Sequence, residues 1–327
     1  MHHASNHKIT SIEQAVSKYV SNGAHLSIGG FTINRNPMAA VHEIIRQGIR
    51  NLHVYAHSNG QGLDQLIGAG CVSRLEIAYS GNGRFAPTCL CFKRAVLERT
   101  IQVEDYTNFQ MALRFLAGAM GVPFLPTYSS LGTDIVEKWG FPDQIRLDEP
   151  KLASKKLVVM DNPFSRDHET EKLVLVPAIH PDVTIIHAQK ADATGCTRIE
   201  GLSFADIDQA KAARHVIVTC DHLVSENELR KDSGANHLPA FCVDAVVHIP
   251  HGAYPTACFN EYDYDAVFLE QYQQAAGNDD TLDPFFQTYI HSPADHAEFV
   301  AMAAQNRLES IRANPVTGYA DRMKRGA

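Results

Sequence analysis

Two adjacent glycines, Gly29 and Gly30, follow a short apolar run at residues 24–28 and precede Pro37, which opens a helical pattern. Glycine has no Cβ, so a ligand can approach its backbone closely, and successive N–H groups there can converge on one point. Such donors beside a helix start suit an anion or the developing oxyanion of acyl transfer. The alternative is a plain tight turn between a strand and a helix. The run matches neither the Gly-x-Gly-x-x-Gly dinucleotide fingerprint nor a phosphate loop.

Further polar stretches end other predicted strands, at residues 57–62, 80–87 and 187–195. In the second stretch, Ser80, Asn82 and Arg84 are of types that can hydrogen-bond or pair with a carboxylate; the alternative is a solvated turn. In the third, His187 and Gln189 alternate with an alanine and therefore point to the same side. A histidine that ends a buried strand is more often a satisfied structural donor than a ligand.

The cysteines and histidines do not form a metal motif. The chain has seven cysteines and 17 histidines, without a Cys-x-x-Cys pair or a close Cys/His cluster. Several cysteines lie in apolar strand-like runs, which is typical of reduced thiols in a cytosolic protein. We expect no metal site, no bound organic cofactor and a cytoplasmic location.

The composition excludes two classes of partner. The 327 residues carry a formal charge of −8, and the basic residues are scattered, so a nucleic-acid surface is not expected. No apolar run approaches the roughly 18 residues that span a bilayer, and the first residues are polar. With 45% apolar and 20% charged residues, the chain is ordinary for a globular protein.

The elements that must position these residues alternate along the chain. Apolar strand-like runs take turns with helical patterns, as in the helix expected at residues 11–23, where Ser11 and Gln14 predict a capping box. This alternation predicts an α/β fold with an open, mostly parallel sheet and helices on both faces. Ligands in such folds lie at the carboxyl ends of the strands, where the polar stretches fall. We expect an α/β domain at residues 1–272, with a loop or insertion near 134–156, and a helical C-terminal extension at 273–327.

An ordered set of motifs resembles a known family. Taken together, the stretches resemble the alpha (A) subunits of family I coenzyme A transferases, in particular those of the glutaconate type, from about residue 9 to residue 272. They occur at residues 27–49, 122–126, 161–164, 185–201, 215–220, 242–247, 250–255 and 262–272. The last fifty residues match only loosely. The fold of that family, shared with NagB-like proteins, agrees with the alternation of elements.

The resemblance implies covalent catalysis that depends on a second polypeptide. In two-subunit members the nucleophile is a glutamate of the beta subunit in a Glu-x-Gly loop, and a glutamyl–CoA thioester forms on it in a ping-pong mechanism. This chain contains no Glu-x-Gly, and glycine follows glutamate directly only at Glu200-Gly201. The resemblance therefore implies that the chain carries no catalytic nucleophile, that it needs a beta (B) subunit, and that CoA enters as substrate. An α2β2 or (αβ)4 assembly is implied by the family alone.

The resemblance also assigns site residues. Gly29, Gly30 and Phe31 are expected to line the cleft shared with the partner, and the two glycine amides are candidates for the oxyanion hole. Ser80, Asn82 and Arg84 are candidates for contacting the distal carboxylate of a dicarboxylic acyl group, glutaconyl or one like it. The family has a more glycine-rich run where this chain has residues 57–59, so residues 57–62 and 80–87 are the expected specificity loops.

Two other interpretations stay open. The same scaffold carries ring-opening acyl-CoA hydrolases and decarboxylases that lack the nucleophilic glutamate, and the hydrolase has an acidic residue just before the helix that leads to the Pro-Phe-Leu-Pro motif. Glu104 and Asp105 precede that helix here, whereas Asn108, nearer its start, is not acidic. The simpler interpretation of both acids is as charges at the first turn of the helix. The other possibility is a non-catalytic chain that only supports its partner.

Overall fold

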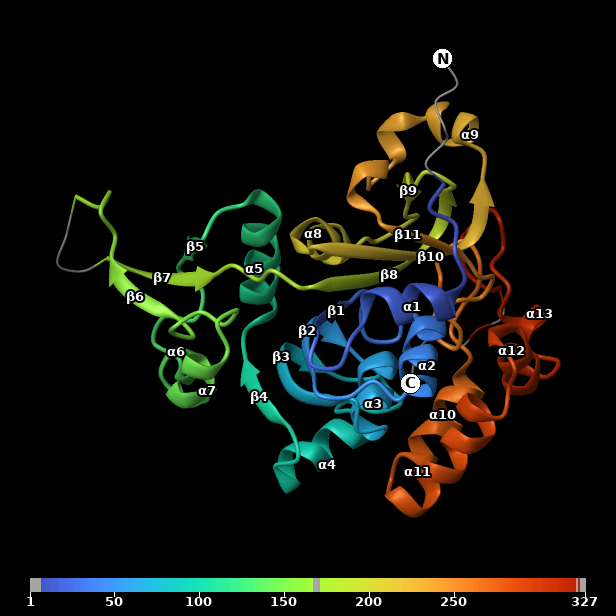
Figure 1. Ribbon diagram of the computed structural model, residues 1–327, viewed down its shortest axis with the longest axis horizontal. Coiled ribbons are helices and arrows are strands. Elements are labelled where there is room, and N and C mark those ends of the chain that lie inside the picture. The colour runs from blue at the N-terminus through green and yellow to red at the C-terminus, as the bar shows by residue number, and fades with distance from the viewer. Residues whose placement is uncertain (1–6, 167–170, 322, 324–327) are drawn as a thin grey trace.

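The central sheet has eight strands in a computed structural model that describes residues 7–166, 171–321 and 323. The strand order is β11-β10-β8-β1-β2-β3-β4, every pair in this order is parallel, and β9 joins β8 in antiparallel fashion (Figure 1). The predicted open, mostly parallel sheet is therefore confirmed. The strands are β1 (His25–Ile28), β2 (Leu52–Asn59), β3 (Val72–Ser80), β4 (Gln102–Asp105), β8 (Val183–Asp192), β9 (Thr197–Arg198), β10 (His215–Val224) and β11 (Ala245–His248).

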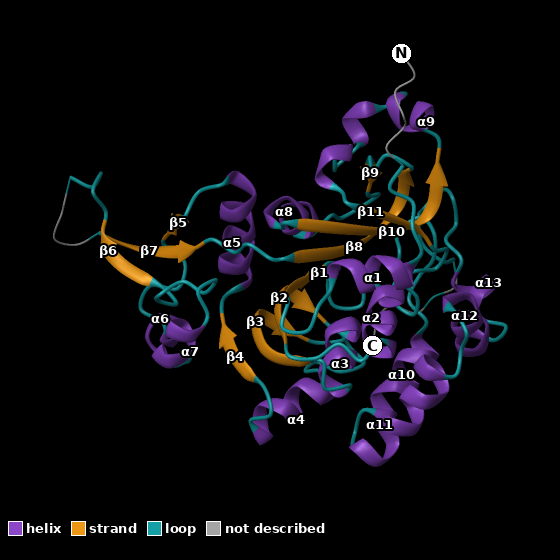
Figure 2. Ribbon diagram, in the orientation of Figure 1, coloured by secondary structure: helices purple, strands orange, loops and turns teal. Residues whose placement is uncertain are grey.

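Helices cover both faces of this sheet, as Figure 2 shows. One face packs against α1 (Ile12–Tyr19), α2 (Met38–Arg46), α3 (Gln61–Gly68) and α4 (Leu90–Glu98) in the largest apolar core. The other face is covered by α5 (Asn108–Met120) and α8 (Asp206–Ala212). Phe115 of α5 packs with Tyr55 of β2, and Ala210 of α8 packs with Ile186 of β8. Strands buried on both faces explain the nearly continuous apolar runs in the sequence.

The caps of α1 and α5 differ from the sequence prediction. The Ser11 side chain accepts a hydrogen bond from the backbone N–H of Gln14, at 3.3 Å, but the Gln14 side chain accepts from Thr10 instead of returning a bond to Ser11. The predicted capping box of α1 is therefore only half formed. A complete box is present at α5, between Thr107 and Gln110.

A second, three-stranded antiparallel sheet extends to one side of the molecule (Figure 1). It consists of β5 (Phe124–Thr127), β7 (Lys172–Pro177) and β6 (Val158–Asp161), in that order. Between β5 and β6 lies the segment predicted as a loop or insertion near 134–156. It contains two short helices, α6 (Asp134–Glu137) and α7 (Asp143–Asp148).

The C-terminal region is helical, as predicted. It contains α10 (Ala266–Ala275), α11 (Asp279–Phe286), a π-helix (Gln287–His291), α12 (His296–Ala304) and α13 (Leu308–Ile311). Phe285 and Phe299 belong to the same apolar core as Leu26 of β1, and the expected boundary at residue 272 falls inside α10. The remaining elements are α9 (Glu226–Arg230) and two short 3₁₀ turns, Ser233–Ala235 and Ala240–Cys242. No helix of the described residues is both long and apolar enough to cross a membrane.

Candidate active site

The glycine pair forms a tight corner at the carboxyl end of β1. Gly30 has φ +84°, and Phe31 and Asn34 then exchange two backbone hydrogen bonds of 2.8 Å. A Cβ on Gly30 would lie 2.6 Å from the carbonyl oxygens of Asn34 and Arg35, and one on Gly29 would lie 2.9 Å from the Ile186 side chain. Both positions therefore exclude a side chain. We call residues 29–35 the glycine corner.

The amides of this corner are already bonded within the chain. The Gly29 N–H donates to the carbonyl of Ile185, at 2.9 Å, and the Gly30 N–H donates to Asp206 Oδ1, at 2.8 Å. Both amides are thus engaged within the chain, which does not favour them as oxyanion donors, and that role stays a prediction. The glycines are needed for the turn and for the close approach of β8 and α8, which is the plain-turn alternative.

A buried ion pair lies beneath the corner. Arg35 Nη2 contacts Asp206 Oδ2 at 2.9 Å, and the two residues are 3% and 0% exposed. Burial raises the pKa of Asp206, whereas Arg35 and the Gly30 N–H act in the opposite direction. The ring of Phe31 stacks on Phe204, with centroids 5.0 Å apart and planes 13° apart.

The predicted specificity loop at 57–62 is instead the end of β2 and the start of α3, and its residues 57–59 meet the corner and the start of α5. The His57 imidazole contacts the Asn108 carbonyl at 3.0 Å, and its ring centroid is 5.6 Å from that of Phe31. Ser58 Oγ donates to Asn108 Oδ1 at 2.5 Å, and Asn59 Nδ2 donates to the Gly29 carbonyl at 3.0 Å. Burial lowers the pKa of His57, so its ring is neutral near pH 7. The Asn59 side chain thus stabilises the glycine corner.

The three candidates for carboxylate contact are in different environments. Ser80 and Asn82 are buried, and Asn82 Nδ2 donates to Gln61 Oε1 at 2.8 Å. Arg84 is exposed, and its guanidinium carbon lies 4.9 Å from the ring centroid of Phe85. Of the three, Arg84 is the one whose side chain reaches solvent, and their role in substrate binding stays a prediction.

Glu104 and Asp105 do not lie in the first turn of a helix, so that interpretation is wrong. Both belong to β4, and α5 begins two residues after Tyr106. Glu104 is fully buried and accepts hydrogen bonds from Tyr106 Oη, at 2.5 Å, from the Phe141 N–H, at 2.8 Å, and from Arg146. Because these donors all belong to the protein, Glu104 anchors the 134–156 segment and is not poised for general acid–base chemistry.

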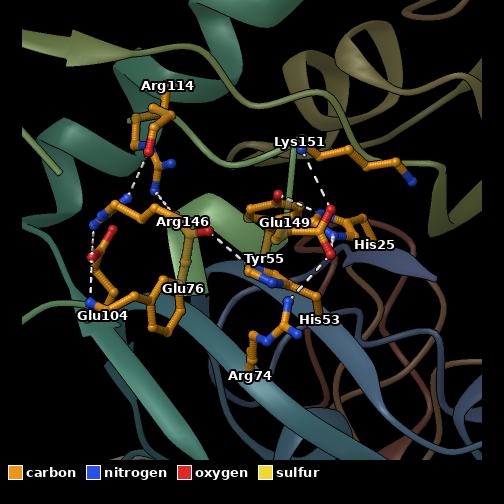
Figure 3. A network of polar contacts seen from close by, with 12 residues as sticks. His25, His53, Tyr55, Arg74, Glu76, Glu104, Arg114, Arg146, Glu149 and Lys151 are labelled. Atoms are coloured by element: carbon orange, nitrogen blue, oxygen red, sulfur yellow. Dashed lines mark hydrogen bonds and ion pairs between the residues drawn. The ribbon is translucent and has the colours of Figure 1, made fainter. Parts of the chain in front are cut away.

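Glu104 belongs to a polar network on the α5 face of the sheet (Figure 3). At its centre, Glu76 of β3 accepts from His53, at 2.7 Å, and forms an ion pair with Arg114 of α5. Burial alone would raise the pKa of Glu76, but Arg114 and His53 hold it at about 2. At one side, Glu149 contacts both His25, at 3.4 Å, and Arg74, at 3.3 Å. The network therefore fastens the 134–156 segment to the sheet.

Sequence reasoning missed this network, and only a weak signal pointed to it. His25, His53 and Glu76 are buried polar residues, each with apolar neighbours on both sides in the sequence. Such residues are rarely buried unless they are paired, so each predicts a partner. The sequence does not identify the partners, because they come from distant segments.

His187 is hydrogen-bonded through both ring nitrogens, as the structural interpretation expected. Its Nδ1 contacts Thr219 Oγ1 at 2.9 Å and its Nε2 contacts Asp221 Oδ2 at 3.0 Å. Cys258 lies beside this pair, so that one ligand-type atom of each of the three residues lies within 4.8 Å of the others. Burial raises the pKa of the Cys258 thiol, and the Asp221 carboxylate raises it further. The ring nitrogens of His187 and the Asp221 carboxylate are already hydrogen-bonded within the chain, the carboxylate also to the His251 N–H at 2.6 Å.

A pocket of ≈ 320 Å³ borders the glycine corner at the carboxyl edge of the sheet. It lies between the corner, residues 200–204, residues 257–264 and the tail at 318–319. Its walls are largely apolar or aromatic and include Ile33, Phe204, Phe259 and Tyr264. The charged residues that line it are Arg35, Glu200 and Asp263. The site thus combines a rigid corner, a neutral histidine and an adjoining pocket of small-molecule size.

Comparison with known proteins identifies the family. The family model described as coenzyme A transferase matches residues 9–248. The A subunit of glutaconate CoA-transferase from Acidaminococcus fermentans is 36% identical over 95% of this chain and 97% of its own. The crystal structure of that enzyme superposes with a TM-score of 0.92 over 96% of this chain and 98% of the matched chain.

Two further relatives define the range of the similarity. The A subunit of 3-oxoadipate CoA-transferase from Pseudomonas knackmussii is 30% identical over 92% of this chain and 99% of its own. The IpdA subunit of the cholesterol ring-cleaving hydrolase from Rhodococcus jostii is 26% identical over 88% of this chain and 93% of its own. With this fold and this extent of similarity, the chain belongs to the coenzyme A transferase family, and two of these three relatives are A subunits of CoA-transferases.

Proposed function

We propose that this chain is the A subunit of a heteromeric enzyme that moves CoA between an acyl-CoA and a carboxylate acceptor. The observation that carries the proposal is similarity along nearly the whole chain to A subunits of two CoA-transferases, in a sequence without a Glu-x-Gly loop. Two carboxylates beside the glycine corner are already engaged: Asp206 with Arg35, and Glu200 with Lys190 and Asn260. A nucleophile from a B subunit would complete the site.

The proposed chemistry proceeds through a glutamate of the partner. Its carboxylate attacks the thioester carbonyl and expels CoA thiolate, which leaves a mixed anhydride. The thiolate then attacks the glutamyl carbonyl, releases the first acid as a carboxylate and forms an enzyme–CoA thioester. The acceptor carboxylate reverses these steps, so one difficult exchange is split into easier ones. We propose no metal and no bound organic cofactor for this sequence, an α2β2 or (αβ)4 assembly, and a cytoplasmic location.

In this proposal the chain supplies one wall of a shared site. The glycine corner, with Phe31 at its tip, faces the acyl-CoA. The relatives named for glutaconate and 3-oxoadipate support a dicarboxylic acyl group. Arg84, which is exposed at the end of β3, is the proposed contact for the distal carboxylate, with Ser80 and Asn82 shaping the loop.

A hydrolase subunit is the second candidate, because a ring-cleaving hydrolase subunit is also related over most of the chain. The carboxylates that precede α5 do not favour it, since Glu104 is buried and Asp105 forms an ion pair with Lys156 at 2.7 Å. A chain that merely supports its partner is the third.

The deciding experiment is borohydride reduction of the complex after addition of acyl-CoA. A transferase forms a glutamyl–CoA thioester on the B subunit, which borohydride reduces, so activity is lost only when acyl-CoA was present. A ring-opening hydrolase shows no acyl-CoA-dependent inactivation and cleaves a carbon–carbon bond of its substrate, so the product still carries the CoA thioester. The isolated chain is the control, and CoA exchange by it alone at the rate of the complex would disprove the proposal.

A further inference from the structure

The segment that begins α8 holds the glycine corner by two different contacts. The Phe204 ring stacks on Phe31, and two residues later the Asp206 carboxylate accepts the Gly30 N–H and the Arg35 guanidinium. Each carboxylate oxygen takes one of these donors, Oδ1 at 2.8 Å and Oδ2 at 2.9 Å. The single side chain of Asp206 therefore spans the corner from Gly30 to Arg35.

The backbone of the corner needs such an anchor. Thr32 has φ +49° and Arg35 has φ +46°, in addition to the positive φ of Gly30. For a β-branched residue such as Thr32 this conformation is an outlier, and it persists only where the surroundings impose it. Phe204, on the anchoring segment, also has a positive φ, +49°. Strain on both sides of one contact is typical of segments that are held for function.

The packing at Gly29 shows that the carboxylate is built into the corner. A Cβ at Gly29 would lie 3.0 Å from the Asp206 carboxylate, so the absence of a side chain there lets the carboxylate approach the backbone. Asp206 is 0% exposed, and it accepts hydrogen bonds from two donors, the positively charged Arg35 guanidinium and the backbone N–H of Gly30. Hydrogen bonds to a buried charged acceptor are strong and directional.

We propose that Asp206 is a positioning residue, which acts through Gly30 and Arg35 to place Phe31 against the acyl-CoA. This inference rests on the function proposed above and adds a specific role for a residue that does not touch the substrate. A purely structural role predicts that loss of Asp206 reduces stability and assembly in step with activity. A positioning role predicts that turnover falls in complexes that remain folded, because misplacement of a reacting group by about 1 Å can slow a reaction by about 100-fold.

The test uses variants of this chain expressed together with its B subunit. Asp206→Ala removes both contacts, whereas Asp206→Asn keeps an acceptor oxygen for the Gly30 N–H and loses the charge that pairs with Arg35. Phe204→Leu removes the stacking contact alone. Asp208→Asn is the matched control. Asp208 lies in the same first turn of α8 as Asp206, but the hydrogen bonds to the corner are those of Asp206. Assembly and Tm are measured for each complex beside kcat, KM for acyl-CoA and the rate of enzyme–CoA adduct formation.

We expect Asp206→Ala to lower kcat and adduct formation by about 100-fold with KM for acyl-CoA changed less than about threefold. Asp206→Asn should restore part of this loss. Phe204→Leu should also lower kcat with little change in KM, but to a smaller extent. Asp208→Asn should match the wild type. If the complex that contains Asp206→Ala does not assemble, the inference is judged on whether Asp206→Asn and Phe204→Leu lower kcat with little change in KM. Wild-type kcat in the assembled variants, or losses that merely follow the amount of assembled complex, would overturn the inference.

The wild-type complex separates this result from the function itself. If it forms no adduct but cleaves a carbon–carbon bond of the acyl-CoA, the transferase proposal fails. The ratio of variant to wild-type cleavage rate then still measures whether Asp206 positions the corner.

Discussion

Arg146 of α7 forms an ion pair with Glu104 of β4 where the two side chains are only 7% and 1% exposed. This pair joins the 134–156 segment to the central sheet (Figure 3). Removing one partner of a buried pair leaves the other charge uncompensated, so we expect Arg146→Ala to lower the free energy of unfolding by about 3 kcal/mol. Arg230→Ala, which removes an exposed pair with Glu226, should cost below about 0.5 kcal/mol. Urea unfolding measures both, and equal effects would contradict the anchoring role of Arg146.

Gly30 should tolerate a side chain less well than a glycine that also has a positive φ but lies in open space. Gly23 has φ +76°, and a Cβ there would meet no heavy atom of the described residues within 4 Å, so Gly23→Ala should cost about 1 kcal/mol from φ alone. At Gly30 the Cβ would also overlap two carbonyl oxygens at 2.6 Å, and we expect Gly30→Ala to cost about 3 kcal/mol or more. The difference between the two variants in chemical unfolding reports the steric part. A Gly30→Ala protein as stable as Gly23→Ala would contradict it.

Acid should destabilise the protein through His25 before most carboxylates titrate. Burial, aided by nearby His53, lowers the pKa of His25 from 6.5 to about 4. Between these values the unfolded chain binds a proton that the folded chain does not, so stability is complete above about pH 6.5 and falls as the pH drops towards 4. The loss from His25 is roughly 2–3 kcal/mol.

The variant that tests this is His25→Gln, which should make the decline in unfolding free energy between pH 6.5 and 4 shallower. His180→Gln, at an exposed histidine, is the control and should leave the slope unchanged. Below about pH 4.5 the Glu76 contribution should be lost as well, because its pKa is lowered to about 2 in the folded protein. An unchanged slope in His25→Gln would assign the acid sensitivity to other groups.

Arg84 should distinguish dicarboxylic from monocarboxylic acyl groups. If its guanidinium binds the distal carboxylate, Arg84→Ala should raise KM for a dicarboxylic acyl-CoA by roughly 10- to 100-fold, the value of a charge-assisted hydrogen bond. KM for a monocarboxylic acyl-CoA of the same length should change little. Arg50→Ala, at the amino end of β2, is the control. Equal changes with both substrates would remove Arg84 from the specificity site.

The order and type of the main elements were predictable because they depend on local patterns. Apolar runs such as β8 and β10, separated by helical periodicity, are enough to predict a parallel sheet covered on both faces. The position of the glycine corner at the end of β1 follows from the same alternation. The helical C-terminal region was equally visible in the spacing of its apolar residues.

The parts that sequence reasoning missed depend on contacts between distant residues. Whether the Gly30 N–H is free or bonded is decided by Asp206, which is 176 residues away along the chain. Glu104 resembles a charge near a helix start, yet Phe141 and Arg146 from the 134–156 segment turn it into an anchor. Single-sequence patterns carry periodicity and local chemistry, but not the identity of such partners.

The polar network and the glycine corner occupy different regions of one sheet. Three network residues, His25, His53 and Arg74, lie within the first three residues of their strands. The corner follows β1, and the stretches at 57–62 and 80–87 begin in the last residues of β2 and β3. Substitutions around the glycine corner need not disturb the acid-sensitive polar network. Because the two regions lie at opposite ends of the same strands, engineering of one end can leave the other intact.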